Sequence, residues 1–514
     1  MDRHRVGRSA ALSVVQVVVA GGALLFFYRY LLDTIGVAAV GVWSVVLATT
    51  SMGRIADFGM SGGVSRFVAR VNTEQLGSRA ATYVETAMLS SAALTALLAV
   101  VALPLLKLAL TNILTRDSIS IAMALLPYAL LSFWVVNLAS VLQGGLDGVL
   151  RVDLRNLIMI GSSFLQVGLG ILFVQRAGIM GLAYAQLGQA LIILLVTWLV
   201  VRRFLPNLSV VPRKWDYPTF LELVGFGWKL QLTSITALLF EPVTKGLLAR
   251  FGGLASTGYY EMATRMIQQI RALLINANQV LVPATADSEK TNPEQVRVLY
   301  RKSYQVVSFL IIPIIGVVMV SLPAISVLWI GHYETRFVAF AALLAIGWFV
   351  NALTGPSYFT AMGLGRMRWN LSGHLVIAAL NLAAGYTLGR IYGGTGVVLG
   401  AVIALIAGSV IIVVKNHCDH GESLTELVPP GTVLLSLGSI LGVASGVASY
   451  RAAQQDHNVV VSLIVGLTMW LAVAAWPTWR HPARRQLTAS LTRLLPYSVA
   501  NPTRSCKEAS AHTE

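Results

Sequence analysis

The sequence has few cysteines and few charged residues, and these two shortages narrow its class. Only Cys418 and Cys506 are present in 514 residues, and charged residues make up 12% of the chain. Both cysteines fall in segments that we predict to be cytoplasmic, so no disulfide framework is expected. A hydrophobic content of 56% and a mean hydropathy of +0.72 exclude an ordinary soluble composition and indicate a membrane protein.

Motifs of several common enzyme classes are also missing. The sequence has no phosphate-binding Gly-x-x-x-x-Gly-Lys-Ser/Thr loop, no Gly-x-Ser-x-Gly elbow and no His-Glu-x-x-His pair. His417, Cys418, Asp419 and His420 resemble a metal-binding cluster, but no second cluster completes a site, so we predict no metal. His374, inside an apolar segment, is interpreted as a packing residue or as a proton carrier. We expect neither enzymatic activity nor a cofactor.

What the sequence does have is a series of apolar segments long enough to cross a membrane. About fourteen occur, at residues 9–31, 38–57, 81–106, 119–142, 156–175, 179–201, 222–248, 256–283, 303–330, 337–361, 370–389, 395–414, 431–450 and 458–478. None of the connections between them is long enough to hold a folded soluble domain. The prediction is therefore an all-α integral membrane protein with about 14 transmembrane helices.

The basic residues predict the orientation of the chain. With the N-terminus inside, 25 Lys and Arg residues fall in cytoplasmic segments and 7 on the opposite side. This asymmetry satisfies the positive-inside rule and predicts that both termini are cytoplasmic. It also accounts for the net charge of +16 without a nucleic acid partner, because no aromatic stacking platform or binding module accompanies the basic clusters. We interpret the basic start of the chain and the apolar run after it as a retained first helix rather than a signal peptide.

An internal repeat is visible at a displacement of about 217 residues. Gly36 and Gly41 lie at the start of the second segment as Gly253 and Gly258 lie at the start of the eighth. Further matches follow the same displacement closely: Arg54 with Arg271, Arg151 with Arg368, Asp153 with Asn370, and Gly178-Ile179-Met180-Gly181 with Gly393-Gly394-Thr395-Gly396. Segments 1–6 and 7–12 are therefore predicted to be two copies of one unit in the same orientation.

The repeat predicts the domain organisation. We expect an N-lobe, a cytoplasmic linker, a C-lobe, two additional helices and a cytoplasmic tail, at residues 1–201, 202–221, 222–415, 416–478 and 479–514. The two additional helices are nearly free of charge and either pack on a lobe or hold a lipid tail. The tail alternates Arg and Leu residues from 481 to 501, which is typical of an interfacial amphipathic helix.

Charged residues inside the segments of residues 222–286 point to a functional site. A charge at bilayer depth costs at least about 2.5 to 3.5 kcal/mol, so such residues should face a bundle interior or a watery cavity. Glu241 and Lys245 are four residues apart, as are Glu261 and Arg265, and residues at this spacing share a helix face. One interpretation is that both are ion pairs that only reduce the cost of insertion.

Lys229 and Arg271 have no acidic residue within a helical turn, which favours a second interpretation, a basic cavity between the lobes. The first lobe offers two further pairs, Arg29 with Asp33 and Arg54 with Asp57. Arg29 and Asp33 lie near the outer end of a segment and could snorkel to the headgroups. Arg54 and Asp57 lie near an inner end and could simply set the insertion depth.

Short motifs resemble a known family. Gly36-x-x-x-x-Gly41-x-Trp43, followed by Asp57-Phe58-Gly59-Met60 and Arg66, resembles the start of the Wzx-type polysaccharide flippases of the multidrug/oligosaccharidyl-lipid/polysaccharide superfamily. The second half looks like the counterpart, with Gly258-Tyr259-Tyr260, Ala263, Arg265 and Pro283. Glu261 departs from the small or apolar residue expected at its position. The resemblance extends over segments 1 to 12.

The resemblance implies a fold like that of MATE transporters, with two six-helix lobes around a V-shaped cavity. It implies the translocation of an undecaprenyl-pyrophosphate-linked oligosaccharide across the bacterial inner membrane by alternating access, for surface or exopolysaccharide biosynthesis. The partners would be this lipid-linked substrate, membrane lipids and polysaccharide polymerase machinery. Because cations compensate a pyrophosphate, we take as substrate contacts Arg54, Lys229, Arg265, Arg271 and Arg29. The coupling or ion-pair candidates are Asp57, Glu241, Lys245 and Glu261.

Two alternatives differ in their working residues. A drug or cation antiporter of the same fold would use Glu241 and Glu261 to bind cations and protons. A polysaccharide polymerase or ligase would need a large outer loop, and the longest outer connection, at about 107–118, is short. Unpaired cations outnumber unpaired acids, which favours the flippase.

Overall fold

The fold comes from a computed structural model. It describes residues 3–51, 59–71, 78–278, 281–282, 285, 293–419, 421, 430–456 and 458–484. Within these ranges, side chains are described except at 3–14, 17–18, 228–238, 273, 276–277, 293 and 455–456.

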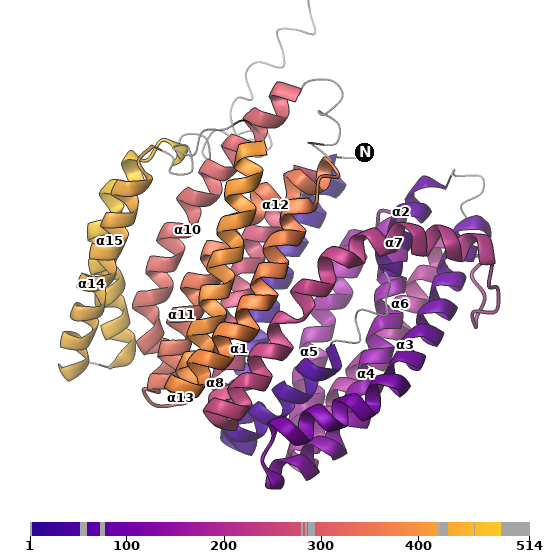
Figure 1. The fold of residues 1–514 in the computed structure, drawn as a ribbon, viewed down its shortest axis with the longest axis horizontal. Helices are drawn as coiled ribbons and strands as arrows, with labels where there is room; N and C mark the ends of the chain where they lie inside the picture. The colour runs from indigo at the N-terminus through magenta and orange to yellow at the C-terminus, as the bar shows by residue number, and fades with distance from the viewer. Residues whose placement is uncertain are drawn as a thin grey trace, which may run out of the picture.

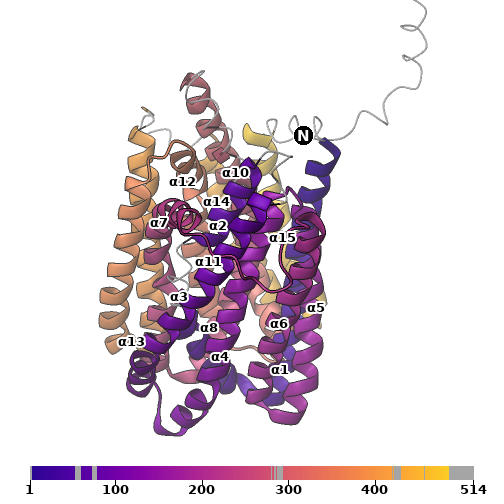
Figure 2. The same cartoon turned by 90° about the vertical axis from the view of Figure 1, so that its right-hand side faces the viewer.

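Helices account for every regular element in the described residues (Figures 1 and 2). They are α1 (Arg3–Ser51), α2 (Met60–Arg70), α3 (Ser78–Ile113), α4 (Arg116–Gly148), α5 (Val152–Ala177), α6 (Ile179–Phe204), α7 (Tyr217–Leu238), α8 (Phe240–Asn278), α10 (Pro293–Ile330), α11 (Thr335–Ala352), α12 (Thr354–Gly363), α13 (Arg368–Asp419), α14 (Thr432–Asp456) and α15 (Val459–Arg480).

Ten helices in the described part of the chain are long and apolar enough to cross a membrane. The chain is thus a multi-pass membrane protein, and the all-α prediction is confirmed. The number of fourteen spans stays a prediction. The charged α8 is not among the ten, because its polar residues lower the hydropathy of the helix.

Several expected segments are joined or divided differently in the structure. The first two expected spans form one kinked helix, α1, which changes direction at Gly36. The expected span 222–248 is two helices, α7 and α8, which meet at Leu239. The expected span 337–361 is likewise divided at Leu353 into α11 and α12. Pro242 and Pro356 lie in the first turns after these breaks, where the missing N–H of proline cannot bond to the preceding helix.

The backbone repeats its geometry at the positions that the sequence pairs. Gly36 has φ 79° and ψ 161°, and Gly253 in α8 has φ 80° and ψ 169°. Gly178 between α5 and α6 has φ 54° and ψ −131°, and Gly393 in α13 has φ 61° and ψ −141°. Positive φ is readily adopted only by glycine, so each pair fixes the same bend in both halves. The predicted repeat is therefore present in three dimensions.

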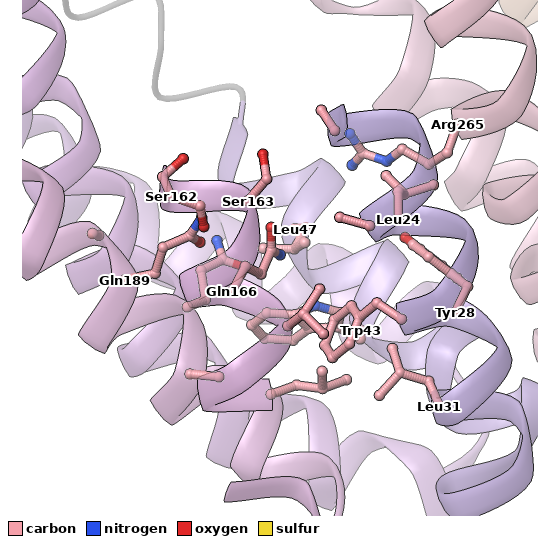
Figure 3. A pocket seen from close by; sticks show the side chains of 18 of the residues that line it. Leu24, Tyr28, Leu31, Trp43, Leu47, Ser162, Ser163, Gln166, Gln189 and Arg265 are labelled. Carbon is pink, nitrogen blue, oxygen red and sulfur yellow. The ribbon is translucent and has the colours of Figure 1, made fainter. Parts of the chain in front are cut away.

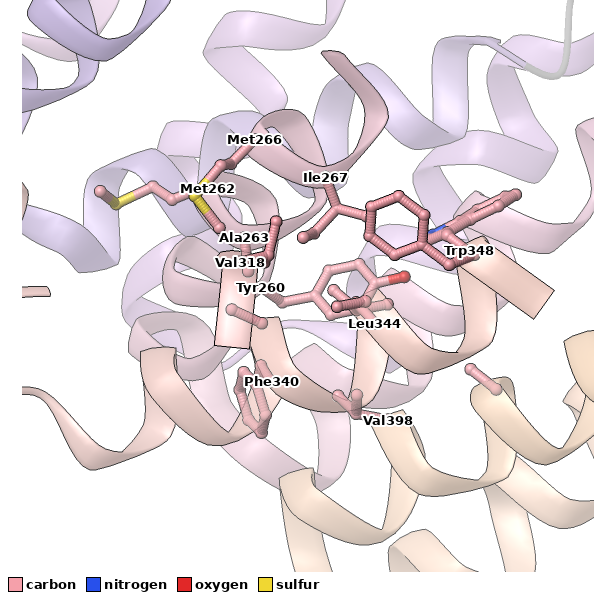
Figure 4. Packing of buried hydrophobic residues seen from close by; sticks show 14 of the residues in the cluster. Tyr260, Met262, Ala263, Met266, Ile267, Val318, Phe340, Leu344, Trp348 and Val398 are labelled. Carbon is pink, nitrogen blue, oxygen red and sulfur yellow. The ribbon is translucent and has the colours of Figure 1, made fainter. Parts of the chain in front are cut away.

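The two kinked helices α1 and α8 form the contact at the centre of the molecule. A Cβ atom on Gly41 would lie 2.0 Å from the carbonyl oxygen of Leu254, and one on Gly258 would lie 2.3 Å from that of Val37. The helices therefore touch backbone to backbone, as small residues allow in membrane proteins. On the C-terminal side α8 packs with α11 and α13 around Tyr260, as Figure 4 shows.

The connection between the two halves, residues 205–216, is hydrogen-bonded to the N-terminal half. Buried Glu85 in α3 accepts hydrogen bonds from the backbone N–H groups of Ser209, Arg213 and Lys214, at 2.9, 3.0 and 2.9 Å. The start of α7 continues along α2 and α3, with Arg66 stacked 4.2 Å from the ring centre of Phe226. Figure 1 shows α7 leading from this half toward α8, which carries the charged residues.

Candidate functional site

The charged residues of α8 gather because the helix bends at Gly253. Glu241 and Lys245 precede the bend and Glu261 and Arg265 follow it. Both predicted pairs form, with Lys245 Nζ 3.2 Å from Glu241 Oε2 and Arg265 Nε 2.7 Å from Glu261 Oε1. Lys245 Nζ also lies 2.7 Å from Glu261 Oε2, which joins the two pairs into one cluster.

Glu261 is the centre of this cluster. In addition to Lys245 and Arg265, it accepts hydrogen bonds from two α1 side chains: Tyr28 OH at 3.2 Å and Ser44 Oγ at 2.8 Å. Four donors therefore surround one carboxylate whose side chain is 3% exposed. A buried charge is tolerated only when it is paired and hydrogen-bonded, and Glu261 meets both conditions.

The four charges cancel, so this cluster contributes no excess positive charge. Its members differ in exposure: the side chain of Lys245 is 2% exposed, whereas those of Glu241 and Arg265 are 38% and 44% exposed. Lys245 and Glu261 form the buried interior of the cluster. Glu241 and Arg265 are the members that a ligand can reach.

A cavity of about 440 Å³ lies beside the cluster, bounded by α1, α4, α5, α6 and α8 (Figure 3). Ser162, Ser163, Gln166 and Gln189 line one side, and Arg265 lies across from them. Gln186 and Gln269 add further amides, and Tyr28 and Trp43 add aromatic rings. The wall opposite Arg265 is polar and uncharged.

A second cavity of about 560 Å³ continues from the first. Its lining includes Glu241, Lys245, Gln268 and Trp348. Four residues line both cavities, namely Leu47, Val136, Gln186 and Arg265. The Arg265 guanidinium thus stands where the two cavities meet.

Arg271 lies about one and a half helical turns after Arg265 in α8, and its side chain contacts an amide and an aromatic ring instead of a carboxylate. Its Nη2 donates to Asn351 Oδ1 at 2.7 Å, and its guanidinium lies 4.6 Å from the ring centre of Trp348. Its buried Nε has no hydrogen-bond partner, and no carboxylate among the described residues pairs with it. Among the described residues, therefore, no carboxylate balances the charge of Arg271, which lies behind Trp348 of the second cavity.

The remaining predicted site residues lie elsewhere or outside the described residues. Arg29 pairs with Asp33 at 3.0 Å, donates to the carbonyl oxygen of Trp329 at 3.2 Å, and lines neither cavity. Arg54 and Asp57 lie outside the described residues, and so does the side chain of Lys229 in α7.

The glutamines and serines of α5 and α6 were missed by the sequence analysis. A usable signal was present, because Gln166, Gln186 and Gln189 interrupt strongly apolar segments, where an amide needs a polar partner or a cavity. The charged residues of α8 gave a stronger signal. Only the packing of α5 and α6 against α1 places the glutamines opposite Arg265.

Two of the histidines singled out in the sequence, His417 and His374, pack against aromatic rings. His417 is buried and lies 3.1 Å from Tyr300 OH through Nδ1, while Asp419 pairs with Arg368. His374 packs edge-on against the ring of Tyr358, at 6.0 Å between ring centres. No group of metal-ligating side chains occurs among the residues that the structure describes.

A sequence profile for a family described as "Polysaccharide biosynthesis protein" matches residues 35–335, which is more than half of the chain. The protein belongs to this family. Among curated proteins, no sequence matches the chain significantly. The matched range includes α8 and the last third of α1, and therefore the charged residues of the cluster and much of both cavities.

Solved structures give the fold of this polysaccharide biosynthesis family member. An inward-facing MATE multidrug resistance transporter of the MOP superfamily aligns with TM-score 0.69 at 14% identity, over 79% of this chain and 94% of that one. The lipid II flippase MurJ, in an inward closed conformation, aligns with TM-score 0.66 at 13% identity, over 93% and 99%. An outward-facing MATE transporter aligns with TM-score 0.55 at 15% identity, over 80% and 95%. The predicted MATE-like fold is confirmed, and it is a fold of transporters rather than of enzymes.

Proposed function

We propose that this protein is a flippase that moves an oligosaccharide linked to undecaprenyl pyrophosphate across the cytoplasmic membrane. The observation that carries the proposal is the position of Arg265 at the junction of two cavities, facing a polar, uncharged wall. A diphosphate needs a cation in a site of low dielectric, and an arginine fork provides charge-assisted hydrogen bonds. Amides and hydroxyls suit the many hydroxyls of a sugar.

The family match to polysaccharide biosynthesis proteins and the likeness to a lipid II flippase support this reading. In the proposal, residues 1–201 and 222–415 rock as two lobes about the α1–α8 contact, with both termini in the cytoplasm. The higher TM-score with an inward-facing transporter than with an outward-facing one supports an inward-facing state here. Polysaccharide polymerase machinery as a partner stays a prediction.

Deleting the gene in its host tests the proposal. We expect surface polysaccharide to disappear and the completed lipid-linked oligosaccharide to accumulate on the inner leaflet of spheroplasts. Complementation with Arg265→Ala should fail, whereas Arg250→Ala, an exposed arginine on the same helix, should restore the polymer. Normal polysaccharide in the deletion strain would refute the flippase.

The alternative is a cation or drug antiporter, and one observation favours it: Glu241 is 38% exposed and lines the second cavity. Against it, Glu261 is buried and its oxygens are occupied by four donors. An antiporter predicts that Glu241→Gln increases sensitivity to cationic drugs and leaves the polysaccharide unchanged. The flippase predicts no change in drug sensitivity.

A further inference from the structure

An apolar groove of about 250 Å³ lies between α1, α3 and α4, away from the charged cluster. Its lining combines threonines with small and large aliphatic residues and one aromatic residue: Thr49, Thr50, Thr95, Leu98, Ala99, Ala102, Leu105, Leu106, Leu130 and Phe133. We name this set the α3 groove. None of its members is charged.

The three threonines do not make the α3 groove polar, because each hydroxyl bonds to its own helix. Thr49 Oγ1 donates to the carbonyl of Val46 at 2.8 Å, and Thr50 Oγ1 donates to the same carbonyl at 3.1 Å. Thr95 Oγ1 donates to the carbonyl of Ser91 at 2.5 Å. Hydroxyls satisfied in this way need no further partner. The groove therefore suits a hydrocarbon and offers few hydrogen bonds to a sugar.

The α3 groove borders the surface that faces lipid. Leu105 on its rim is 65% exposed, and Leu97 and Val101 continue an exposed apolar stripe along α3. These residues are positions 20, 24 and 28 of the 36 residues of α3, a helix long and apolar enough to cross a membrane. In Figures 1 and 2, α3 runs along the outside of the N-terminal half. A chain in the membrane can reach the groove sideways.

The groove also adjoins the second of the central cavities. Thr50 and Phe133 line both the α3 groove and the second cavity, which contains Glu241, Lys245 and Arg265. These two side chains form a shared wall between an apolar space and a polar space with charges. An amphiphile with a charged head and a long apolar chain fits this arrangement.

We propose that the α3 groove holds the isoprenoid chain of the lipid-linked substrate while its diphosphate and sugars occupy the central cavities. This inference rests on the proposed flippase function. Each buried CH₂ group is worth about 0.8 kcal/mol, so drawing the chain into a polar cavity would be very unfavourable. The groove lets the chain stay in an apolar environment next to the headgroup site.

Photo-crosslinking tests the location directly. The probe is undecaprenyl-diphosphate N-acetylglucosamine with a diazirine on an isoprene unit, reconstituted with the full-length protein in phosphatidylcholine vesicles. We expect adducts on α3 and α4 at groove residues such as Leu98, Ala102 and Leu130, and loss of these adducts when unlabelled undecaprenyl diphosphate competes. Adducts confined to other helices, for instance α14 and α15, would overturn the inference. Equal labelling of the groove by a diazirine phospholipid would also overturn it, because the groove would then be an ordinary lipid contact.

A pair of variants on one helix tests the role of the groove in transport. Ala99→Phe fills the groove, whereas Ala96→Phe adds the same ring at an exposed position outside it. We expect Ala99→Phe to lose most groove adducts and to slow flipping of the probe at least tenfold, with Ala96→Phe close to wild type. Equal flipping by both variants contradicts the inference. Crosslinking needs binding but no transport, so it fails or succeeds separately from the gene deletion that tests the flippase.

Discussion

Ser44 of α1 and Glu261 of α8 occupy equivalent positions of the two halves, 217 residues apart, and are hydrogen-bonded to each other at 2.8 Å. Two further donors to Glu261 are related in the same way, because Tyr28 and Lys245 are also 217 residues apart. The approximate twofold axis of the repeat therefore passes close to Glu261. One half contributes the carboxylate, and both halves contribute donors to it.

This arrangement predicts a large effect of Glu261→Gln on stability. The substitution leaves Lys245 buried with only the partial compensation of Glu241, and removing one partner of a buried ion pair costs about 3–5 kcal/mol. We expect a clear drop in the thermal transition of the detergent-solubilised protein.

The double variant Glu261→Gln/Lys245→Met provides the control, because it removes the stranded ammonium group as well. It should recover part of the lost stability. A double variant less stable than Glu261→Gln by the full effect of Lys245→Met alone would show that the two residues do not interact.

The backbone contact between Gly41 and Gly258 predicts that neither position accepts a side chain. A Cβ at Gly258 would lie 2.3 Å from the carbonyl oxygen of Val37, so Gly258→Ala must push α1 and α8 apart. We expect loss of the monodisperse peak in size-exclusion chromatography. Gly168→Ala in α5 is the matched control, because its Cβ meets no atom within 4 Å and alanine favours a helix.

The backbone conformation of Leu150 predicts that replacing it with glycine stabilises the protein. The φ of Leu150 is 59°, the left-handed region. The turn after α12 has the same pattern of backbone hydrogen bonds and places Gly365, with φ 69°, at the corresponding position. A non-glycine residue in this conformation costs about 1–2 kcal/mol. Leu150→Gly should therefore raise the melting temperature, since the leucine side chain is 66% exposed. Gly365→Leu should lower it, and an unchanged melting temperature in both would contradict the assignment.

Substitution of Arg271 should abolish polysaccharide export without lowering the amount of protein in the membrane. Arg271→Ala removes the half-buried cation stacked on Trp348, and Lys229→Ala removes the other cation that the sequence leaves unpaired. We expect both variants to insert at wild-type levels in membrane fractions and to produce no surface polysaccharide. Arg271→Lys should recover only part of the export, because an ammonium group neither stacks as well nor reproduces the bond to Asn351. Normal polysaccharide in both alanine variants would exclude them from the site.

Substitution of Gln186 should weaken recognition of the sugar. Its amide lines both cavities, and the Gln186→Leu variant preserves its volume while removing its hydrogen bonds. One lost hydrogen bond of about 1 kcal/mol corresponds to a several-fold weaker affinity for the lipid-linked oligosaccharide, measured by binding in nanodiscs. Thr387→Val, at an exposed position of α13 whose hydroxyl bonds to its own helix, should bind as wild type does.

The sequence by itself determined the features that depend on local spacing. Runs of apolar residues gave the membrane class and the helices, and the 217-residue displacement gave the repeat, because glycines with positive φ must recur wherever the same bend recurs. The pairs Glu241–Lys245 and Glu261–Arg265 also followed from the sequence, since residues four apart on a helix meet wherever the helix lies.

Tertiary structure alone decided what depends on contacts between helices. The bend at Gly253 and the crossing with α1 join the two pairs through Lys245 and Glu261 and turn an expected basic group into a neutral cluster. Packing of α5 and α6 against α1 places uncharged amides opposite Arg265, and Arg29 lies outside both cavities. Sequence spacing does not specify distances between segments far apart in the chain. The packing of side chains between those segments specifies them.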